Sequence, residues 1–410
     1  MEVTYWPAAV GAYLWHEYDE RAVEIDLTAI AARGLHGIRV CLAWDAFMPT
    51  PRQVSRPRLR NLEHLLGVAA RVGLGVTPVL FGQSLGSDVL LPLYAIDPAG
   101  SRAGVRVVTD GVVQLGGPRD QYNDPLMLEV ETVWLETLLG AFSGHPSLVA
   151  WDLGHDPAST MRPRRFGHLQ SWVALHADRV RRSGDRVRLT LGAADLLTAR
   201  GVRLGLVAPA LDSVGLQVEP QWLPADQLGG EVDAPVFLAQ LAMRLAGARP
   251  LELETSLASR RSDDGEAALA GSTTRLDPLP WDIPLLDEPV AATRAGDTVA
   301  RLAEVGVGGA HLAAWSDWGP RALAAPPGDL RPAMARRGAV DSRGEPTPLG
   351  DRWCAQVAKE PAVAVAQPWP DHLDVEDYYA NLPDSARELH AQWRLGTDPD
   401  ERGAEEARAR

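Results

Sequence analysis

The chain has 410 residues, and its 54 acidic side chains outnumber 40 basic ones, which gives a formal net charge of −14. This acid excess argues against a nucleic-acid or anionic-membrane partner, because phosphate groups would be repelled rather than neutralised. The single lysine, Lys359, lies in a Pro- and Ala-rich segment, which argues against a P-loop and against lysine-based Schiff-base chemistry. Two cysteines, Cys41 and Cys354, cannot build a multi-thiolate metal site. We therefore expect no metal and no cofactor.

The N-terminal stretch has no basic segment followed by an apolar run, and no part of the sequence is apolar over the length of a membrane span. With 46% hydrophobic residues the chain can bury a large core. These features predict a cytoplasmic protein without a membrane partner. No feature of the sequence indicates its oligomeric state.

Short apolar runs alternate with amphipathic ones from Tyr5 to Trp318, a pattern typical of a parallel sheet with helical connections. Eight strands are predicted, at Val3–Trp6, Gly37–Leu42, Gly75–Phe81, Leu148–Leu153, Val187–Leu191, Ser213–Val218, Pro250–Glu254 and Gly309–Trp315. Helices are predicted at Ala22–Arg33, Pro57–Val72, Pro125–Phe142, Phe166–Arg182, Ala234–Ala246 and Thr293–Val305. The helical stretch after the fifth strand is short and poorly defined.

Eight strands at this spacing predict a (β/α)8 TIM barrel over residues 1–350, with a doubly wound sheet as the alternative. The long loops 82–123 and 255–292 would rise over the C-terminal face, where such barrels place their chemistry. Aromatic residues beyond 350 predict a C-terminal helical extension, residues 351–396, that packs on the barrel. Residues 397–410 are predicted to be disordered.

The most informative motif lies at the end of the fourth predicted strand. There Trp151-Asp-Leu-Gly-His-Asp-Pro157 places the carboxylate of Asp156 at the edge of the sheet. The motif resembles the Trp-(Glu/Asp)-Leu-Gly-Asn-Glu-Pro pattern of retaining glycoside hydrolases of the cellulase and mannanase type, family 5 and its relatives. In that family the Glu is the general acid/base. In this chain His155 stands at the Asn position and Asp156 at the Glu position.

The resemblance continues in order over roughly three quarters of the chain, and several spaced motifs are more specific than one. Val3–Pro7 is similar to the first strand of the family. Gly37–Val40, followed by Trp44–Pro49, is similar to the second, with Arg39 at the position of the arginine that steadies the nucleophile. Pro250–Thr255 is similar to strand seven, where Glu254 matches the nucleophile better than Glu252. Gly309–Trp318 is similar to strand eight, in which Trp315 stands at the position of the tryptophan that forms the bottom of the sugar-binding site.

Glycoside cleavage needs one carboxyl group that protonates the leaving oxygen and one that attacks or activates water. The resemblance implies these roles for Asp156 and Glu254, with Arg39 holding Glu254 ionised and with Trp44 and Trp315 stacking on the sugar. The implied ligand is a β-linked gluco- or manno-configured oligosaccharide or glycoside.

Four positions, in the fourth and sixth predicted strands and their ends, depart from the family pattern. Aspartate is one methylene shorter than glutamate, so its carboxyl group lies about 1.5 Å, roughly one C–C bond, further back from the substrate. Because the gap between the two carboxyl groups decides the mechanism, the site could be retaining, inverting or inactive. His155 replaces an asparagine that donates a hydrogen bond to the sugar 2-hydroxyl. Gln217 and Glu219 stand where the family has a His-x-Tyr pair on strand six. A barrel that binds carbohydrate without turnover is therefore an alternative.

A second alternative comes from another class of enzyme. Gly82-Gln-Ser-Leu-Gly86 satisfies the G-x-S-x-G pattern of an α/β-hydrolase nucleophile elbow. In that interpretation Ser84 would be the nucleophile of a serine esterase, with a downstream histidine such as His311 as its base.

Overall fold

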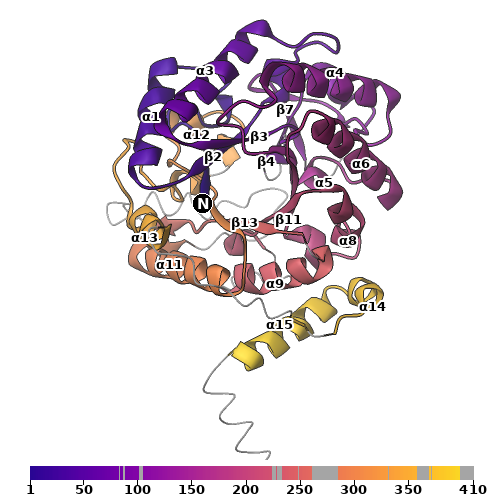
Figure 1. Ribbon diagram of the computed structural model, residues 1–410, viewed down its shortest axis with the longest axis vertical. Helices are drawn as coiled ribbons and strands as arrows, with labels where there is room; N and C mark the ends of the chain where they lie inside the picture. Colours follow the sequence, from indigo (N-terminus) through magenta and orange to yellow (C-terminus); the bar gives the residue numbers. More distant parts are fainter. Residues whose placement is uncertain are drawn as a thin grey trace, which may run out of the picture.

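Eight parallel strands pair edge to edge and close into a barrel in the computed structural model of the protein (Figure 1). The barrel strands are β1 (Glu2–Thr4), β2 (Gly37–Cys41), β3 (Gly75–Val79), β10 (Trp151–His155), β11 (Val187–Gly192), β12 (Ser213–Gln217), β13 (Leu251–Thr255) and β16 (Gly309–Leu312). They follow one another in this order, and β16 closes the ring against β1 through Val3 and Leu312. All eight predicted strands are present, and the closure confirms the TIM barrel over the doubly wound sheet.

The structure describes residues 1–397 except 83, 86–87, 101–104, 224–227, 229–232, 248, 261–284, 331, 358–368 and 371. Much of the predicted loop 255–292 and Lys359 therefore lie outside the described residues, as does the predicted disordered tail from residue 398 onwards.

Helices follow the strands and surround the barrel as an outer ring (Figure 1). They are α1 (Glu20–Ala32), α3 (Arg56–Val72), α4 (Pro125–Phe142), α6 (Phe166–Arg182), α8 (Leu204–Val207), α9 (Ala234–Ala246), α11 (Glu288–Glu304) and α13 (Pro348–Val357). The shortest of these, α8, runs into a 3₁₀ turn at Ala208–Ala210 and explains the weak helical signal after the fifth strand. Among the described helices, none combines the length and the apolar character that crossing a membrane requires.

Local capping signals explain where several helices begin and end. Asp124 accepts a hydrogen bond from the backbone N–H of Leu126 at 2.9 Å, and Pro125 occupies the first turn of α4, where its missing N–H costs nothing. Asp19 caps α1 in the same way. Helix α3 ends at Gly73, whose φ of +76° is a conformation that glycine adopts without a steric penalty.

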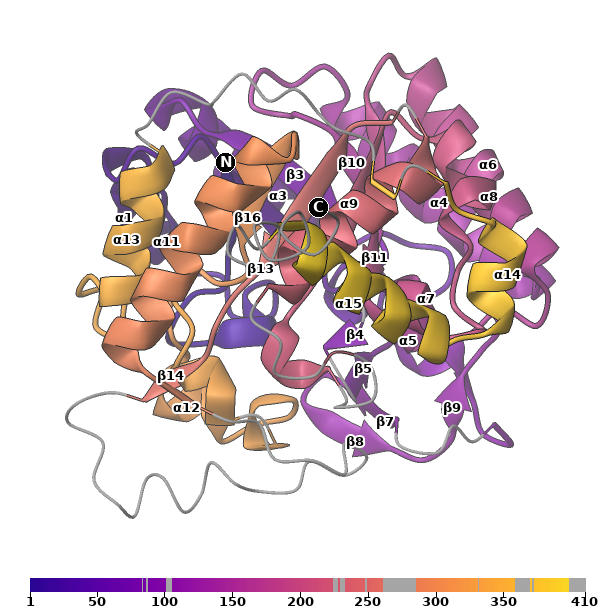
Figure 2. The same ribbon diagram turned by 90° about the horizontal axis from the view of Figure 1, so that it is seen from below.

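The long segment after β3 builds a separate small layer over one end of the barrel. Four short strands, β4 (Ser84–Leu85), β5 (Asp88–Leu90), β7 (Arg106–Thr109) and β8 (Val112–Gln114), form one sheet. Figure 2 shows these strands on the same side of the molecule as α12 (Pro320–Leu323). Arg106 ties this sheet to the loops after β16, because its guanidinium bonds to both Asp88 and Asp329. The predicted placement of this segment above the C-terminal face is therefore what the structure shows.

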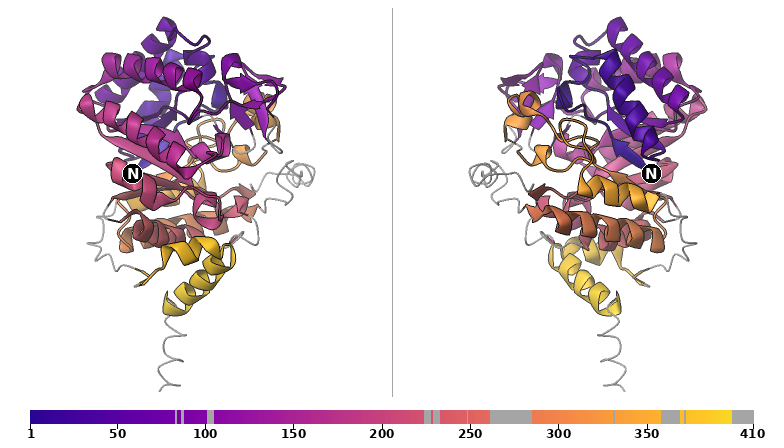
Figure 3. Two further views of the ribbon diagram at one scale, coloured as in Figure 1. Left: turned by 90° about the vertical axis from the view of Figure 1, so that its right-hand side faces the viewer. Right: turned by 90° about the vertical axis from the view of Figure 1, so that its left-hand side faces the viewer.

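The C-terminal region differs from its predicted boundary. Helix α13 crosses residue 350 and packs against α11, so it completes the ring of the barrel instead of opening an extension. Helices α14 (Val375–Ala380) and α15 (Asp384–Thr397) lie outside that ring (Figure 3). Trp393 of α15 packs edge-on against Phe237 of α9, and the Tyr378 hydroxyl donates to the carbonyl of Leu196 at 2.8 Å. The extension thus packs on the barrel through aromatic side chains.

The interior of the barrel contains a buried ion network. Arg188 on β11 reaches three carboxylates: Asp152 at 3.2 Å, Glu2 at 3.4 Å, and Glu252. His311 accepts from the backbone N–H of Glu2 and contacts Glu252 at 3.0 Å. Buried charges are tolerated only when they are paired, and removing one partner from such a pair is strongly destabilising. The network therefore fixes the side chains directly beneath the C-terminal face.

Candidate active site

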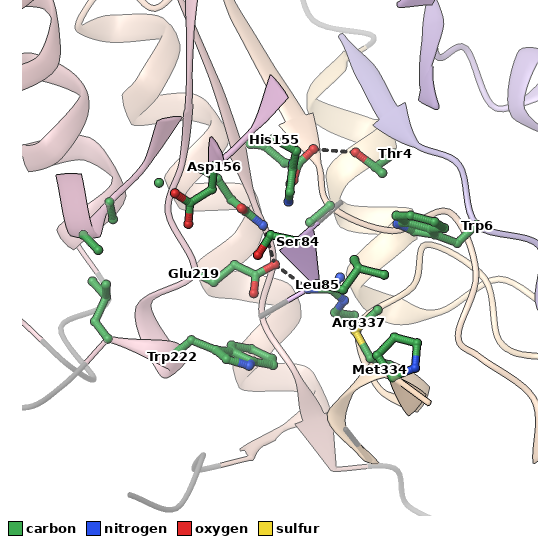
Figure 4. Close-up of a pocket in the computed structure, with 18 of the residues that line it drawn as sticks. Thr4, Trp6, Ser84, Leu85, His155, Asp156, Glu219, Trp222, Met334 and Arg337 are labelled. Carbon is green, nitrogen blue, oxygen red and sulfur yellow. Dashed lines mark hydrogen bonds and ion pairs between the residues drawn. The ribbon is translucent and has the colours of Figure 1, made fainter. Parts of the chain in front are cut away.

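A pocket of about 170 Å³ lies at the carboxyl ends of the barrel strands (Figure 4). Its polar lining comes from Thr4, Ser84, His155, Asp156, Gln217, Glu219, Glu254 and Arg337, and its aromatic lining from Trp6, Trp222 and Trp318. A cavity of about 150 Å³ accommodates a benzene-sized ring. The pocket therefore has room for at least about one six-membered ring.

Glu254 is held in one orientation at the base of this pocket. Its Oε2 atom accepts hydrogen bonds from the Thr4 hydroxyl and from Arg39 Nη1, the latter at 3.1 Å. Its Oε1 atom lies 4.0 Å from Nδ1 of His155, and no hydrogen bond to it is found among the described residues. Burial alone would raise the pKa of Glu254, but the Arg39 charge and the hydrogen bond from Thr4 lower it to about 2. Glu254 is therefore ionised, with one oxygen fixed and the other available.

Arg39 links this carboxylate to the ion network of the barrel interior. It is 1% exposed, and its Nη2 atom lies 3.0 Å from Oδ2 of Asp152. Asp152 also accepts from the Thr190 hydroxyl at 2.6 Å. Arg39 thus cannot swing away from Glu254 without breaking bonds beneath it. The prediction that Arg39 pairs with Glu254 agrees with this geometry.

His155, the last residue of β10, is fixed in one tautomer by the same arginine. Arg39 Nη1 lies 2.7 Å from His155 Nδ1, and since a guanidinium only donates, Nδ1 must be the acceptor. Burial, together with the Arg39 charge, lowers the pKa of His155 to about 4. The ring is therefore neutral with its proton on Nε2, so that it presents a hydrogen-bond donor at the pocket wall.

Asp156 holds its carboxyl group against Gly192, at the end of β11. Its backbone is left-handed with φ of +47°, at the N-cap of the short helix α5 (Pro157–Thr160), and the Ser159 hydroxyl donates to its Oδ2. The carboxyl lies over Gly192, where a Cβ atom would come within 2.6 Å of Oδ2. In Figure 4 Asp156 and Thr4 lie on opposite sides of His155. Asp156 lines the pocket as predicted, but from its far wall.

Gln217 and Glu219 also line the pocket, at the end of β12. The Gln217 amide lies 3.5 Å from Oε1 of Glu219, and Glu219 forms an ion pair with Arg337. The Arg337 guanidinium stands 5.9 Å from the centre of the Trp222 ring. The combination of an aromatic face with a buried ion pair suits a ligand that has one apolar face and several hydroxyl groups.

Trp44 and Trp315, which were predicted to stack on the sugar, are not among the residues that line the pocket, and neither is Arg39. Trp44 is 1% exposed and packs edge-on against Phe81 and Tyr94. Trp315 is 2% exposed and hydrogen-bonds to Asp26. Both are core side chains in this structure, and neither can stack on a ligand in the pocket from this position.

The aromatic pocket wall comes from three other tryptophans that the sequence reasoning did not assign. Trp6 and Trp318 lie within motifs that carried the resemblance, and their rings meet edge-to-face at 6.2 Å. Trp222 follows β12 on the 3₁₀ turn Pro220–Trp222. Arg337 was missed as well, because no motif surrounds it.

Three residues that belong to the alternative interpretations of the sequence, Glu252, Ser84 and His311, do not have the positions that those interpretations require. Glu252 points into the interior ion network and does not line the pocket, which agrees with the preference for Glu254. Ser84 lines the pocket, but it belongs to a two-residue strand paired antiparallel with β5 and not to a strand-to-helix elbow. His311 is bonded within the barrel interior. Ser84 and His311, the two residues named for the serine-esterase interpretation, thus lie in different parts of the barrel: one in the pocket lining and the other in the interior ion network.

One group of potential metal ligands exists among the described residues. Single ligand atoms of Glu2, Glu252 and His311 lie within 4.8 Å of one another. Arg188 already binds both carboxylates, and both ring nitrogens of His311 are engaged. The protein's own cation therefore occupies the position that a metal ion would take.

Comparison with known proteins shows which fold this barrel has. No family model matches the sequence, and no curated protein matches it. Among solved structures, a GH5_18 protein from Streptomyces cattleya in complex with Manβ1-4GlcNAc superposes with a TM-score of 0.74 at 18% identity, over 98% of this chain and 92% of that one. The fold is therefore a family 5-like (β/α)8 barrel.

Two further structures support this assignment of the fold. A GH5_18 protein from Bifidobacterium longum subsp. infantis gives a TM-score of 0.71 at 16% identity, over 89% of this chain and 80% of that one. An exo-β-1,4-mannosidase from Opitutaceae bacterium strain TAV5 gives 0.67 at 18% identity, over 88% of this chain and 59% of that one. The resemblance to family 5 that the sequence motifs indicated is thus confirmed for the fold.

Proposed function

We propose that the protein is a glycoside hydrolase that removes one β-linked sugar of manno or gluco configuration from the end of a short oligosaccharide. Glu254 would be the nucleophile, and Asp156 would protonate the leaving oxygen. The observation that carries the proposal is the state of Glu254: it is ionised, buried, fixed through Oε2, and open at Oε1 in a pocket with room for at least about one six-membered ring.

The reaction would proceed in two steps. In the first, Glu254 Oε1 attacks the anomeric carbon while the acid gives its proton to the departing glycosidic oxygen. In the second, water attacks the same carbon, releases the sugar, and returns a proton to the acid. Arg39 and Thr4 would keep the carboxylate aligned through both steps, because they bind the oxygen that does not react.

The pocket walls support a sugar ligand. Trp222 offers a flat apolar face, while Gln217, Glu219 and Arg337 offer donors and acceptors for hydroxyl groups. His155 lines the pocket with its proton on Nε2, and this N–H would donate to a hydroxyl group of the sugar. The Streptomyces cattleya structure holds Manβ1-4GlcNAc, and the Opitutaceae relative is named an exo-β-1,4-mannosidase, which favours a β-mannoside over a β-glucoside.

A chromogenic assay tests the proposal. Wild type and Glu254→Gln are incubated with 4-nitrophenyl β-mannoside and β-glucoside, with Glu304→Gln on the exposed face of α11 as the matched control. We expect hydrolysis by wild type and by the control, and a loss of at least about 1,000-fold in Glu254→Gln, since removing a nucleophile removes the covalent route. Equal background rates in all three proteins would refute the proposal.

A second candidate function is binding of the same sugars without turnover. The orientation of Asp156, held over Gly192 by its left-handed backbone and by Ser159, favours it. Calorimetry with Manβ1-4GlcNAc separates the two candidates. Heat of binding with an intact disaccharide after prolonged incubation would establish the binding protein, whereas release of mannose would establish the enzyme.

A further inference from the structure

One side of the pocket is an apolar wall built from two segments that are far apart in the sequence. Leu85 comes from β4, in the segment after β3, whereas Pro327 and Met334 come from the segment after β16. Leu85 and Met334 belong to one hydrophobic cluster with Trp6 and Trp318, which also line the pocket. In Figure 4 Leu85, Met334 and Trp6 lie on the same side of the pocket. The shape of this wall therefore depends on how the two segments are held together.

Arg106 of β7 joins these two segments through four hydrogen bonds. Its Nε and Nη2 atoms donate to the two oxygens of Asp88, at 2.6 and 2.9 Å. Its Nη1 and Nη2 atoms donate to the two oxygens of Asp329, at 2.8 and 2.6 Å. Bidentate bonds between a guanidinium and a carboxylate are stronger and more directional than single hydrogen bonds. We call Arg106, Asp88 and Asp329 together the clamp.

Both carboxylates of the clamp belong to the segments that form the apolar wall. Asp88 of β5 is the register partner of Leu85 in the antiparallel pair of β4 and β5. Asp329 belongs to the 3₁₀ turn Gly328–Leu330, two residues after Pro327. A shift of either carboxylate would therefore move a residue that lines the pocket.

The two halves of the clamp differ in burial. Asp88 is fully buried, whereas the side chains of Arg106 and Asp329 are 21% and 32% exposed. The hydrogen bonds from Arg106 lower the pKa of Asp329, so this carboxyl group is ionised at neutral pH. The Asp329 half of the clamp is thus accessible to screening by salt. It can also be removed without leaving a buried carboxylate unpaired, because Arg106 would still bind Asp88.

We propose that Arg106 is a positioning residue for ligand binding: the clamp holds the apolar wall in the shape that packs on a sugar ring before the sugar binds. The inference rests on the proposed function for the identity of the ligand. Glu254 does not depend on the clamp, because Arg39 and Thr4 hold it from the barrel interior. Without the link to Asp329, binding would have to order the two wall segments, and this ordering lowers the affinity. The clamp therefore controls affinity and not the rate of the chemical step.

Kinetics of Asp329→Asn with 4-nitrophenyl β-mannoside test the clamp. We expect KM to rise about 10-fold while kcat changes by less than about 2-fold, because ordering one or two side chains on binding accounts for a factor of this size. Arg106→Lys is a second variant in case Asp329→Asn misfolds. It keeps the charge but lacks the planar fork, so it should raise KM to a similar extent. The matched control is Arg33→Gln, because Arg33 is 18% exposed and pairs with Asp351 away from the pocket lining.

Salt provides a readout that a merely structural role would not change. The mannoside is uncharged, so added ions do not screen its own contacts with the pocket. From about 0.01 to about 1 M NaCl the Debye length falls from about 30 Å to about 3 Å. We expect the wild-type KM to rise at least about 2-fold over this range, because the Asp329 half of the clamp weakens. The KM of Asp329→Asn should stay constant.

The outcomes separate this inference from the proposed function. An unchanged KM in folded Asp329→Asn, or a loss that falls on kcat, would overturn the inference but leave the proposed function standing. If wild type does not hydrolyse the mannoside, the proposed function fails, and calorimetry with Manβ1-4GlcNAc makes the same comparison. A Kd about 10-fold higher in Asp329→Asn would then support the clamp, and an equal Kd would overturn it. Wild type that neither hydrolyses nor binds these sugars would overturn both.

Discussion

Replacing Arg39 by glutamine tests the electrostatic basis of the site without requiring any substrate. The side chain of Arg39 is 2% exposed and pairs with Asp152 at 3.0 Å and with Glu254 at 3.1 Å. Arg39→Gln keeps a polar side chain of similar length but removes the charge. Asp152 and Glu254 then remain buried without the positive charge of Arg39 beside them. Breaking a buried ion pair in this way lowers the free energy of unfolding by about 3–5 kcal/mol.

The pKa of Glu254 gives an independent magnitude for the same effect. It lies at about 2, against 4.5 for an ordinary glutamate. Each pKa unit corresponds to about 1.4 kcal/mol, so the surroundings favour the ionised form by about 3 kcal/mol. Because the pKa is lower in the folded state, this stabilisation is present above about pH 4.5 and is lost as the pH falls towards 2. The deficit of Arg39→Gln should therefore be largest at neutral pH and should shrink in acid.

Urea unfolding followed by tryptophan fluorescence at pH 7 and at pH 3.5 measures this deficit. The matched control is Arg33→Gln, which removes an arginine whose partner, Asp351, is 64% exposed. Such a pair contributes at most about 1 kcal/mol. The reasoning would be refuted if Arg39→Gln and Arg33→Gln unfolded at the same urea concentration at pH 7. A deficit of Arg39→Gln that is equal at both pH values would also contradict it.

Three further variants test other parts of the structure. Trp222→Ala should raise KM for a β-mannoside about 10-fold with little change in kcat, because one aromatic contact contributes up to about 1.5 kcal/mol to binding. An unchanged KM would show that Trp222 does not bind the sugar. Glu131 is fully buried, and burial raises its pKa well above the ordinary range. The folded state therefore favours the protonated carboxyl group, and the wild-type protein loses stability as the pH rises. Glu131→Gln, which cannot ionise, should match the wild-type free energy of unfolding near pH 4 and exceed it at pH 8. Urea curves that differ by a constant amount at the two pH values would contradict this. Trp393→Ala should lower the free energy of unfolding by about 3–5 kcal/mol. Its kcat/KM should stay unchanged, because the ring packs on Phe237 and neither residue lines the pocket. A loss of activity in the folded variant would link the extension to the site.

Most of the barrel could be predicted from the sequence because parallel strands that are buried on both faces read as continuous apolar runs. Each of the eight strands lies within a few residues of its predicted position, and α6 and α9 begin and end at the predicted residues. Helix α13 crosses the predicted boundary at residue 350 and packs on α11 as the last helix of the ring. A helix that closes a barrel and a helix that extends it have the same amphipathic pattern.

The site was predictable where strand position alone determines it. Arg39, His155 and Glu254 lie on or at the ends of strands, so the pleat and the barrel closure bring them together. The sequence alone could not show that Trp44 and Trp315 are core residues and not sugar-binding residues, because the burial of a ring depends on which loop covers it. The direction of Asp156 depends on one left-handed backbone angle and on the absence of a side chain at Gly192, and neither feature is visible in a motif.

Trapping with 2-deoxy-2-fluoro-β-mannosyl fluoride tests the central claim most directly. Fluoride leaves without protonation, so the reagent reports on the nucleophile independently of Asp156. Mass spectrometry of peptides from the treated protein should find one fluoromannosyl group, bound to Glu254 and missing from Glu254→Gln. A protein that hydrolyses the chromogenic mannoside but carries no label, or carries it on another residue, would contradict the assignment of Glu254 as the nucleophile.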